Sequence, residues 1–229
     1  MKKQVLTVAE MRELDNYVIN RDDAAIKLMG NAGAALSDEL MDFSNIAVVC
    51  GPGNNGGDGF AAIYALQQRD FLDNKHVSIF YTREPKSEES KHFFENITHK
   101  NVRLEEFCKD CLERDFDVIV DCLLGTGFSG TPRGTIKEAI EAINARVLPA
   151  RAMAAIENKY PKIISMDINS GVNGDSGDGE IAVKSNLTLS VGYLKVGMEK
   201  PCFKKWADEV KNVNIGYTEQ DLRDAGILS

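Results

Sequence analysis

Glycine, amide and carboxylate side chains are concentrated in one short segment, Cys50–Gly59, whose sequence is CGPGNNGGDG. Glycine permits positive φ angles and lets the backbone approach a ligand closely, so exposed N–H groups can bind phosphate where a helix begins. A tight turn needs one or two glycines, whereas this segment has five. The segment therefore predicts a phosphate-binding loop rather than a turn that only reverses the chain.

Common nucleotide signatures match this loop only in part. Three of its glycines have the spacing GxGxxG, but the next apolar run ends at Tyr81 without the acidic residue that binds ribose in hydride-transfer enzymes. A Walker loop needs Gly-Lys-Ser/Thr, and here the sequence continues as Gly-Gly-Asp58. The loop therefore fits neither a nicotinamide-dependent dehydrogenase nor a P-loop NTPase.

Two later segments repeat the same order of a buried apolar run, a carboxylate and a glycine-rich loop. They are Asp121–Gly134 (DCLLGTGFSGTPRG) and Asp167–Gly177 (DINSGVNGDSG). The first of them predicts a second anion-binding loop, formed by Gly125, Gly127 and Gly130 with the hydroxyl donors Thr126, Ser129 and Thr131. Lys195, flanked by two glycines, is placed to reach the same crevice.

Oxygen-bearing side chains in these loops also predict a cation site. Asn55, Asp121 and Ser170 together supply oxygen ligands with a single formal negative charge. Such a set suits a hard cation, and its low charge favours a monovalent ion over Mg²⁺ or Ca²⁺. No Cys/His cluster in the sequence points to a transition metal.

The elements that position these loops alternate between strands and helices. Apolar runs predict strands at 46–50, 77–81, 118–121 and 163–167, with weaker candidates at 187–191 and 210–215. Helices are predicted from a capping box at Thr7, and at 24–41, 58–69, 87–100 and 133–158. This order predicts a single α/β domain over residues 1–229, a Rossmann-like three-layer α/β/α sandwich with a mostly parallel sheet. Ligands of such sheets bind beyond the carboxyl ends of the strands, where the three loops lie.

Composition excludes several classes of protein. The chain has 229 residues, a formal net charge of −8 and 43% hydrophobic residues, which is ordinary for a globular protein. An acidic chain is a poor general binder of nucleic acid or anionic membranes, and no apolar run approaches the roughly 18 residues of a membrane span. Without a signal-peptide pattern, we expect a cytoplasmic protein with no nucleic-acid or membrane partner and with reduced cysteines. The CxxC of Cys108 and Cys111 is expected to lie on a surface helix.

Six segments carry a family resemblance. They are AEMRELD at Ala9–Asp15, LMGNAG at Leu28–Gly33, VCGPGNNGGDG at Val49–Gly59, DCLLGTG at Asp121–Gly127, DINSG at Asp167–Gly171 and GYLKVG at Gly192–Gly197. In this order they resemble the NAD(P)HX epimerases, the family of the YjeF N-terminal domain. Those proteins are isomerases that repair hydrated NADH and NADPH (NADHX and NADPHX) by interconverting the epimers at C6 of the damaged nicotinamide ring.

The resemblance implies roles for particular residues. It implies that Asp167 is the acid–base residue, with Lys195 beside it, and that one K⁺ is held partly by Asn55, Asp121 and Ser170. The implied substrate contacts are Asn54, Asn55, Gly56, Gly57, Asp58, Gly125, Thr126, Gly127, Phe128, Ser129, Gly130, Thr131 and Asp167. Asn169 stands where the family usually has Pro, which predicts a looser loop between Asp167 and Ser170, and Gly30 stands where Glu is usual.

Partners also follow from the resemblance. Many bacterial members carry a fused dehydratase domain, and we expect a separate NAD(P)HX dehydratase to act in the same pathway. A homodimer is expected as well. Two other functions compete with an epimerase: a non-catalytic nucleotide-binding or scaffold module of the same fold, and a dinucleotide-dependent oxidoreductase. The intact Asp121, Asp167 and Lys195 argue against the first, and the missing ribose acid argues against the second.

The reaction needs a bond at C6 to break and re-form on the other face of the ring. Loss of water would give an iminium ion, and ring opening would give an aldehyde. Either route needs a proton donor for the leaving atom and a base for the return, and a carboxylate in a partly dry crevice can serve as both. An anionic Asp167 would also stabilise the positive charge of an iminium ion.

Overall fold

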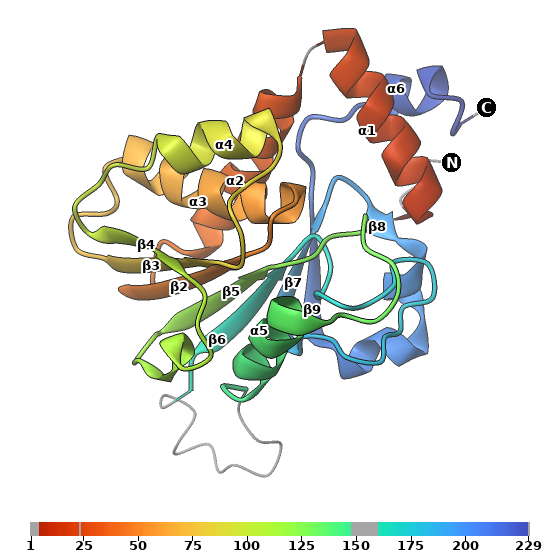
Figure 1. Cartoon of the computed structure of the whole chain (residues 1–229). Helices are drawn as coiled ribbons and strands as arrows, with labels where there is room; N and C mark the ends of the chain where they lie inside the picture. Colours follow the sequence, from red (N-terminus) through yellow and green to blue (C-terminus); the bar gives the residue numbers. More distant parts are fainter. Residues whose placement is uncertain (1–4, 23, 148–159, 229) are drawn as a thin grey trace.

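A seven-stranded parallel sheet forms the centre of the molecule in the computed structural model, which describes residues 5–22, 24–147 and 160–228. The strand order is β4-β3-β2-β5-β6-β7-β9, and every neighbouring pair is parallel. Helices cover both faces, so the predicted Rossmann-like three-layer architecture is confirmed (Figure 1). In such a sheet the carboxyl ends of β2, β5 and β6 lie along one edge.

Most strands form where the apolar runs predict them. The bounds are β2 Asn45–Cys50, β3 His76–Tyr81, β5 Val118–Cys122, β6 Lys162–Met166, β7 Ser185–Val191 and β9 Ala207–Val213. The central strands β2 and β5 are almost entirely buried, which is why they read as continuous apolar runs. The sequence prediction missed β4 (Val102–Glu106), a partly exposed edge strand with three charged residues and no apolar run.

Helices α2 (Ala25–Glu39), α3 (Asn54–Gln68) and α4 (Glu88–Glu95) cover one face of the sheet, and α5 (Gly134–Asn144) covers the other (Figure 1). Gly33 lets α2 lie directly against α3, because a Cβ at this position would collide with Ala61. Two predicted helices differ from the structure. The helix predicted at 87–100 ends at Glu95, and the one predicted at 133–158 ends at Asn144, with residues 148–158 outside the described part of the chain.

Helix α1 (Val8–Asp22) lies over the carboxyl edge of the sheet beside α6 (Glu219–Asp224) (Figure 1). The predicted capping box is confirmed, since the Thr7 N–H donates to Glu10 Oε2 at 2.8 Å and the Glu10 N–H donates to Thr7 Oγ1 at 3.2 Å. A second, two-stranded parallel sheet joins β1 (Val5–Leu6) to β8 (Leu194–Lys195). Segments from both ends of the described chain therefore meet above the main sheet.

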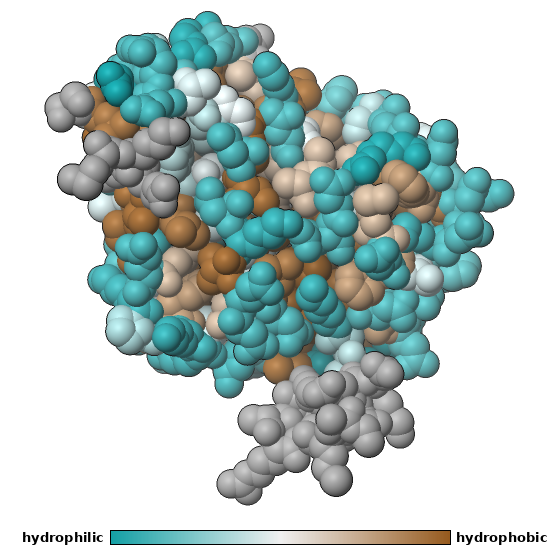
Figure 2. All heavy atoms as spheres, turned by 180° about the vertical axis from the view of Figure 1, so that it is seen from behind, coloured by the Kyte–Doolittle hydropathy of each residue, from teal (hydrophilic) through white to brown (hydrophobic). Residues whose placement is uncertain are grey.

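The outer surface mixes residue types. Seen from behind, hydrophilic residues cover much of the molecule and hydrophobic ones lie between them (Figure 2).

Cys108 is exposed and Cys111 is buried at the start of a short 3-10 helix (Cys111–Glu113), so the predicted surface helix for this pair is wrong. None of the helices in the described ranges is both long and apolar enough to cross a membrane.

Candidate functional site

A cavity of about 700 Å³ lies where the loops after β2, β5 and β6 meet helix α1. Eight of the residues predicted from the sequence line it: Asn54, Asn55, Asp58, Gly125, Thr126, Gly127, Phe128 and Asp167. Carboxylates outnumber cations on its described walls, with Asp15, Asp58, Glu89 and Asp167 against the single guanidinium of Arg12.

Other predicted contacts shape the site without lining it. Gly56 and Gly57 are buried in the first turn of α3, where a Cβ at Gly56 would collide with the carbonyl oxygen of Gly51. Ser129, Gly130 and Thr131 lie outside the cavity, and Thr131 Oγ1 donates to Glu180 at 2.9 Å. Gly56 thus lets the loop at Gly51 fold closely onto α3, and Gly57 leaves room for the side chains of Met29 and Ser90.

Helix α3 begins directly at the wall of the cavity. Its N-cap is Gly53, which has extended backbone angles and no side chain that can cap the first N–H groups. These N–H groups and the positive end of the helix dipole are therefore open to an anion. Glycine at this position agrees with the predicted phosphate-binding loop.

Asp167 is held by donors on both carboxylate oxygens. Lys195 Nζ donates to Oδ1 at 2.5 Å, and the Thr126 N–H donates to Oδ2 at 3.0 Å. The Lys195 side chain is 1% exposed and is fixed further by the Val191 carbonyl at 2.9 Å and Ser190 Oγ at 3.3 Å. Two donors are the arrangement expected around a carboxylate anion. The structure thus brings together the two residues predicted to be catalytic.

The backbone of Asp167 adopts an unusual conformation. Its φ is +65°, in the left-handed region that Asp tolerates better than most residues. Asp167 directly follows β6, and its backbone conformation turns the carboxylate towards the loop after β5. A Cβ at Gly125 in that loop would lie 2.9 Å from Asp167 Oδ2. Glycine at 125 therefore leaves room for the Asp167 carboxylate.

Two further carboxyl groups share the cavity, and burial raises the pKa of both. Asp58 on α3 has its pKa raised mainly by burial, with a further contribution from the negative charge of Asp167. Burial raises the pKa of Asp15 to about 6, against the hydrogen bond from Tyr217 Oη to its Oδ1 at 2.5 Å. Sequence reasoning assigned no role to Asp15 or Tyr217, and Asp15 entered only as the last residue of the AEMRELD segment.

The residues predicted to bind a cation, Asn55, Asp121 and Ser170, lie beneath the loop that follows β5. Asp121 is fully buried and accepts hydrogen bonds from Ser170 Oγ at 2.5 Å and from the Ser170 N–H at 2.9 Å. Asn55 is 6% exposed, and neither polar atom of its amide has a hydrogen-bond partner among the described residues. Ser170 Oγ also meets the backbone of Leu124, next to Gly125, and a Cβ on Gly125 would lie 3.5 Å from Asn55 Cβ.

This arrangement fits a weakly charged cation. The Asn55 amide oxygen is buried without a hydrogen-bond partner, and the Asp121 carboxylate and Ser170 hydroxyl contribute further oxygen atoms with one negative charge. The described residues contain no group of three or more His, Cys, Asp or Glu side chains suited to a metal ion. One carboxylate with neutral amide and hydroxyl oxygens is a donor set of low charge, which suits a monovalent ion better than a divalent one.

Asn169 corrects one expectation from the sequence. The absence of Pro at this position predicts a looser loop, yet Asn169 is fully buried. Its Nδ2 donates to Ser185 Oγ and the Trp206 carbonyl, both at 2.9 Å, and its Oδ1 accepts from Thr188 Oγ1 at 2.7 Å. Side-chain hydrogen bonds thus anchor the loop between Asp167 and Ser170 where a proline ring would have restricted the backbone.

Comparisons with known proteins identify the family of this chain. Residues 25–197 match the family described as YjeF-related protein N-terminus. The NAD(P)H-hydrate epimerase of Rhodopirellula baltica is 31% identical over 97% of this chain and 88% of that protein. The protein of the same name in Lentilactobacillus buchneri is 30% identical over 93% of this chain and 94% of that protein.

Two further matches extend the comparison. The bifunctional NAD(P)H-hydrate repair enzyme Nnr of Thermofilum pendens is 31% identical over 85% of this chain, which spans 36% of that longer protein. The crystal structure of yeast ynu0, YNL200c, superimposes with a TM-score of 0.77 at 17% identity, over 98% of this chain and 94% of that one. At this identity the structural match supports the fold.

Proposed function

Because this chain belongs to the family of the YjeF-related protein N-terminus, we propose that it is an NAD(P)H-hydrate epimerase, an isomerase acting on hydrated NADH and NADPH. The observation that carries the proposal is the Asp167–Lys195 ion pair at the wall of a cavity between two glycine-rich loops. Both loops and both residues of the pair fall within the matched range 25–197.

The dinucleotide would be held by the two loops. The open N-terminus of α3 at Gly53–Asp58 suits the pyrophosphate, because its N–H groups have no side-chain cap. The loop at Gly125–Phe128 lies on the same cavity and suits the remainder of the nucleotide. Ser129, Gly130 and Thr131 would contact only a part of the ligand that extends beyond the cavity. These contacts orient the damaged ring and contribute positioning rather than chemistry.

Asp167 would act on the reacting carbon. Its carboxylate, held by Lys195 and the Thr126 N–H, can stabilise positive charge on the ring when the hydroxyl at C6 departs as water. The same carboxylate can accept the proton released when water adds back. Lys195 is almost fully buried and keeps Asp167 in the orientation that both tasks need.

One K⁺ would be held by Asn55, Asp121 and Ser170. Bound there, it would offset negative charge and fix the loops after β2 and β5. The unpartnered Asn55 amide supports this assignment. We place the ion beneath the loops that bind the dinucleotide.

The cation assignment predicts that Asn55→Leu uncouples stability from K⁺. Leu removes the ligand oxygen and also the unpartnered polar atoms, so the variant should match or exceed wild-type stability in K⁺-free buffer. K⁺ at 100 times its dissociation constant should stabilise the wild type by about 2.7 kcal/mol and leave the variant unchanged. Thermal unfolding in KCl, NaCl and MgCl₂ measures this. Stabilisation of both proteins by Mg²⁺ but not K⁺ would rule the assignment out.

The epimerase proposal is tested by following the two epimers directly. A sample enriched in R-NADHX or R-NADPHX should relax to the equilibrium mixture faster with the protein than without it, as measured by chiral separation. Comparing the two substrates would also give the preference between them. Folded protein that binds an NADPH-like ligand but leaves the relaxation rate unchanged would favour a binding module over an enzyme.

The proposal also covers a partner enzyme, the oligomeric state and the location of the protein in the cell. A separate dehydratase would act on the same damaged dinucleotide, which agrees with relatives named as bifunctional repair enzymes in which this chain spans about a third of the length. We propose a homodimer located in the cytoplasm. Size-exclusion chromatography with light scattering would measure the oligomeric state.

A further inference from the structure

We propose that Asp15, hydrogen-bonded to Tyr217, is a second catalytic carboxyl group, which acts with Asp167 as the other half of an acid–base pair. The inference rests on the proposed epimerase function and adds a residue to its chemistry. An epimerase must donate a proton on one face of a carbon and accept a proton on the other face. A single carboxylate at one wall of the cavity serves one face well, and the structure provides another carboxyl group at a different wall.

The two carboxyl groups enter the cavity from different elements. Asp167 follows β6 at the edge of the sheet, whereas Asp15 comes from α1, which lies over that edge. Asp15 Oδ1 accepts from Tyr217 Oη at 2.5 Å, and no hydrogen bond to Oδ2 is made within the described residues. One oxygen is thus fixed by the protein while the other is free to meet a ligand.

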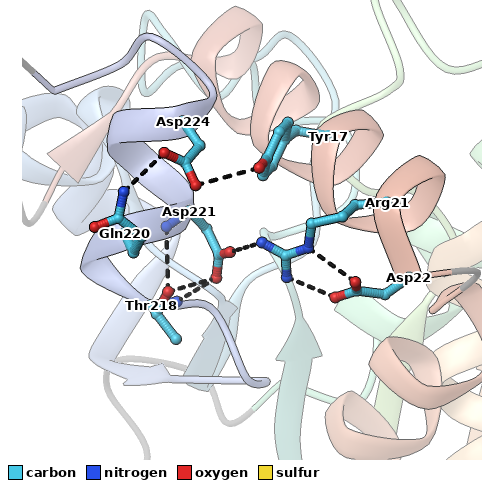
Figure 3. Close-up of polar contacts among 7 residues, drawn as sticks. All are labelled: Tyr17, Arg21, Asp22, Thr218, Gln220, Asp221 and Asp224. Carbon is cyan, nitrogen blue, oxygen red and sulfur yellow. Dashed lines mark hydrogen bonds and ion pairs between the residues drawn. The ribbon is translucent and has the colours of Figure 1, made fainter.

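The orientation of Asp15 is fixed by contacts that tie α1 to α6. Further along α1, Tyr17 Oη donates to Asp224 at 3.2 Å and Arg21 Nη1 donates to Asp221 at 2.5 Å (Figure 3). Tyr217 directly precedes Thr218, the N-cap of α6, whose capping box with Asp221 appears in the same view (Figure 3). The cavity-facing carboxyl and its tyrosine partner therefore belong to one joined unit.

The surroundings of the two carboxyl groups differ in charge. Asp167 has a lysine ammonium and a backbone N–H on its oxygens, which suits the anion. Around Asp15 lie Tyr217, Asp58, Asp167 and Lys195. Burial, together with the negative charge of Asp167, raises the pKa of Asp15 to about 6, against the hydrogen bond from Tyr217 and the positive charge of Lys195. A buried carboxyl group that favours its protonated form, across the cavity from a carboxylate held by two donors, suits the roles of acid and base.

The proposed step is balanced in atoms and charge. The proton of Asp15 passes to the hydroxyl oxygen on C6, the C–O bond breaks with its electron pair on oxygen, and water leaves. The lone pair of the ring nitrogen then forms the C=N bond of the iminium ion beside the Asp167 carboxylate. Water adds to the other face of C6, the pair returns to nitrogen, and the released proton goes to Asp167. The reverse reaction uses the same groups in exchanged roles, and solvent protons restore the starting state.

The first test is the substitution Asp15→Asn, which keeps the shape of the side chain and an oxygen for Tyr217. We expect kcat for epimerisation to fall about 100-fold, at the lower end of the range for general acid–base catalysis, with little change in the Kd of an NADPH-like ligand. Glu13→Gln is the matched control, because Glu13 is exposed on the same helix and does not line the cavity. It should keep wild-type kcat.

The second test uses the pH profile, which a purely structural role would not move. Both directions of the reaction need one proton on the pair, so kcat/KM of the wild type should fall as the pH rises through about 6. The hydrogen bond from Tyr217 lowers the pKa of Asp15. Its loss in Tyr217→Phe should raise that pKa and shift the alkaline limb to higher pH, while Asp15→Asn should lack this limb.

The outcomes separate this inference from the function on which it rests. If the wild type does not epimerise NADHX or NADPHX, the proposed function fails and this inference fails with it. If the wild type is active and Asp15→Asn keeps its kcat, only the role of Asp15 is overturned. A Tyr217→Phe profile that coincides with that of the wild type would also overturn it, even if Asp15→Asn does not fold.

Discussion

Asp167→Asn should bind the dinucleotide almost as well as the wild type and lose most of its epimerase activity. Asn is nearly the same shape as Asp and also tolerates the left-handed backbone at φ +65°. It can accept a hydrogen bond from Lys195 but cannot exchange a proton or offset a positive charge at neutral pH. We expect kcat to fall by about 10²–10⁴-fold, and kcat/KM with it, because the lost interaction belongs to the transition state.

The measurement pairs epimer relaxation with ligand-induced thermal shifts. Asp208→Asn is the matched control, since Asp208 is exposed on β9 and contacts Asn186 on the neighbouring strand. A variant at position 167 with near-normal kcat at saturating substrate and a raised KM would assign Asp167 to binding. Lys195 would then be the next candidate for the chemical step.

Lys195→Met should weaken both the activity and the fold. Removing one partner of a buried ion pair leaves the other charge without compensation, which costs about 3–5 kcal/mol where both groups are fully buried. The Asp167 side chain is 16% exposed and keeps some contact with water, so we expect a loss of about 2–4 kcal/mol in the free energy of unfolding. Loss of the ion pair should also lower kcat, because Asp167 loses the contact that orients it.

The loss of stability should depend on pH. Lys195 lowers the pKa of Asp15 and Asp58, so its removal raises the pKa of both in the folded state. A folded variant that binds more protons becomes less stable relative to the wild type as the pH rises, and the difference should widen as the pH rises above about 6. Urea unfolding at several pH values measures this. Lys211→Met, which breaks an exposed pair with Glu39, should cost at most about 1 kcal/mol, and an equal loss in both variants would contradict the prediction.

Burial decides which parts of the fold the sequence predicts. β2 and β5 are covered on both faces, so continuous apolar runs predict them within a residue or two. β4 is a half-exposed edge strand with charged side chains, and β1 and β8 have two residues each, too few for any pattern. The end of α4 is set by Asn96, whose Nδ2 donates to the His92 carbonyl at 2.7 Å, a local contact that helical periodicity does not contain.

The residues of the candidate site also divide into those that sequence patterns predict and those that they miss. Strand-end carboxylates and glycine loops place Asp121 and Asp167 at one edge, because parallel strands end together. The partnership of Asp15 with Tyr217 spans 202 positions and depends on how α1 and the segment before α6 pack, which no spacing rule encodes. Asn169 is similar, because its hydrogen bonds reach Ser185, Thr188 and Trp206, which lie 16, 19 and 37 positions further along the chain.

The small sheet of β1 and β8 affects the order of events during folding. Strands β6, β7 and β9 are added beside β5 in chain order, so each of these pairings closes a much shorter loop. Pairing of Leu6 with Lys195 must instead close a loop that contains most of the chain, with a correspondingly larger loss of entropy. We expect β1 and α1 to dock late, after the parallel sheet has formed. A newly made molecule would then pass through a compact but inactive intermediate whose cavity still lacks its upper wall.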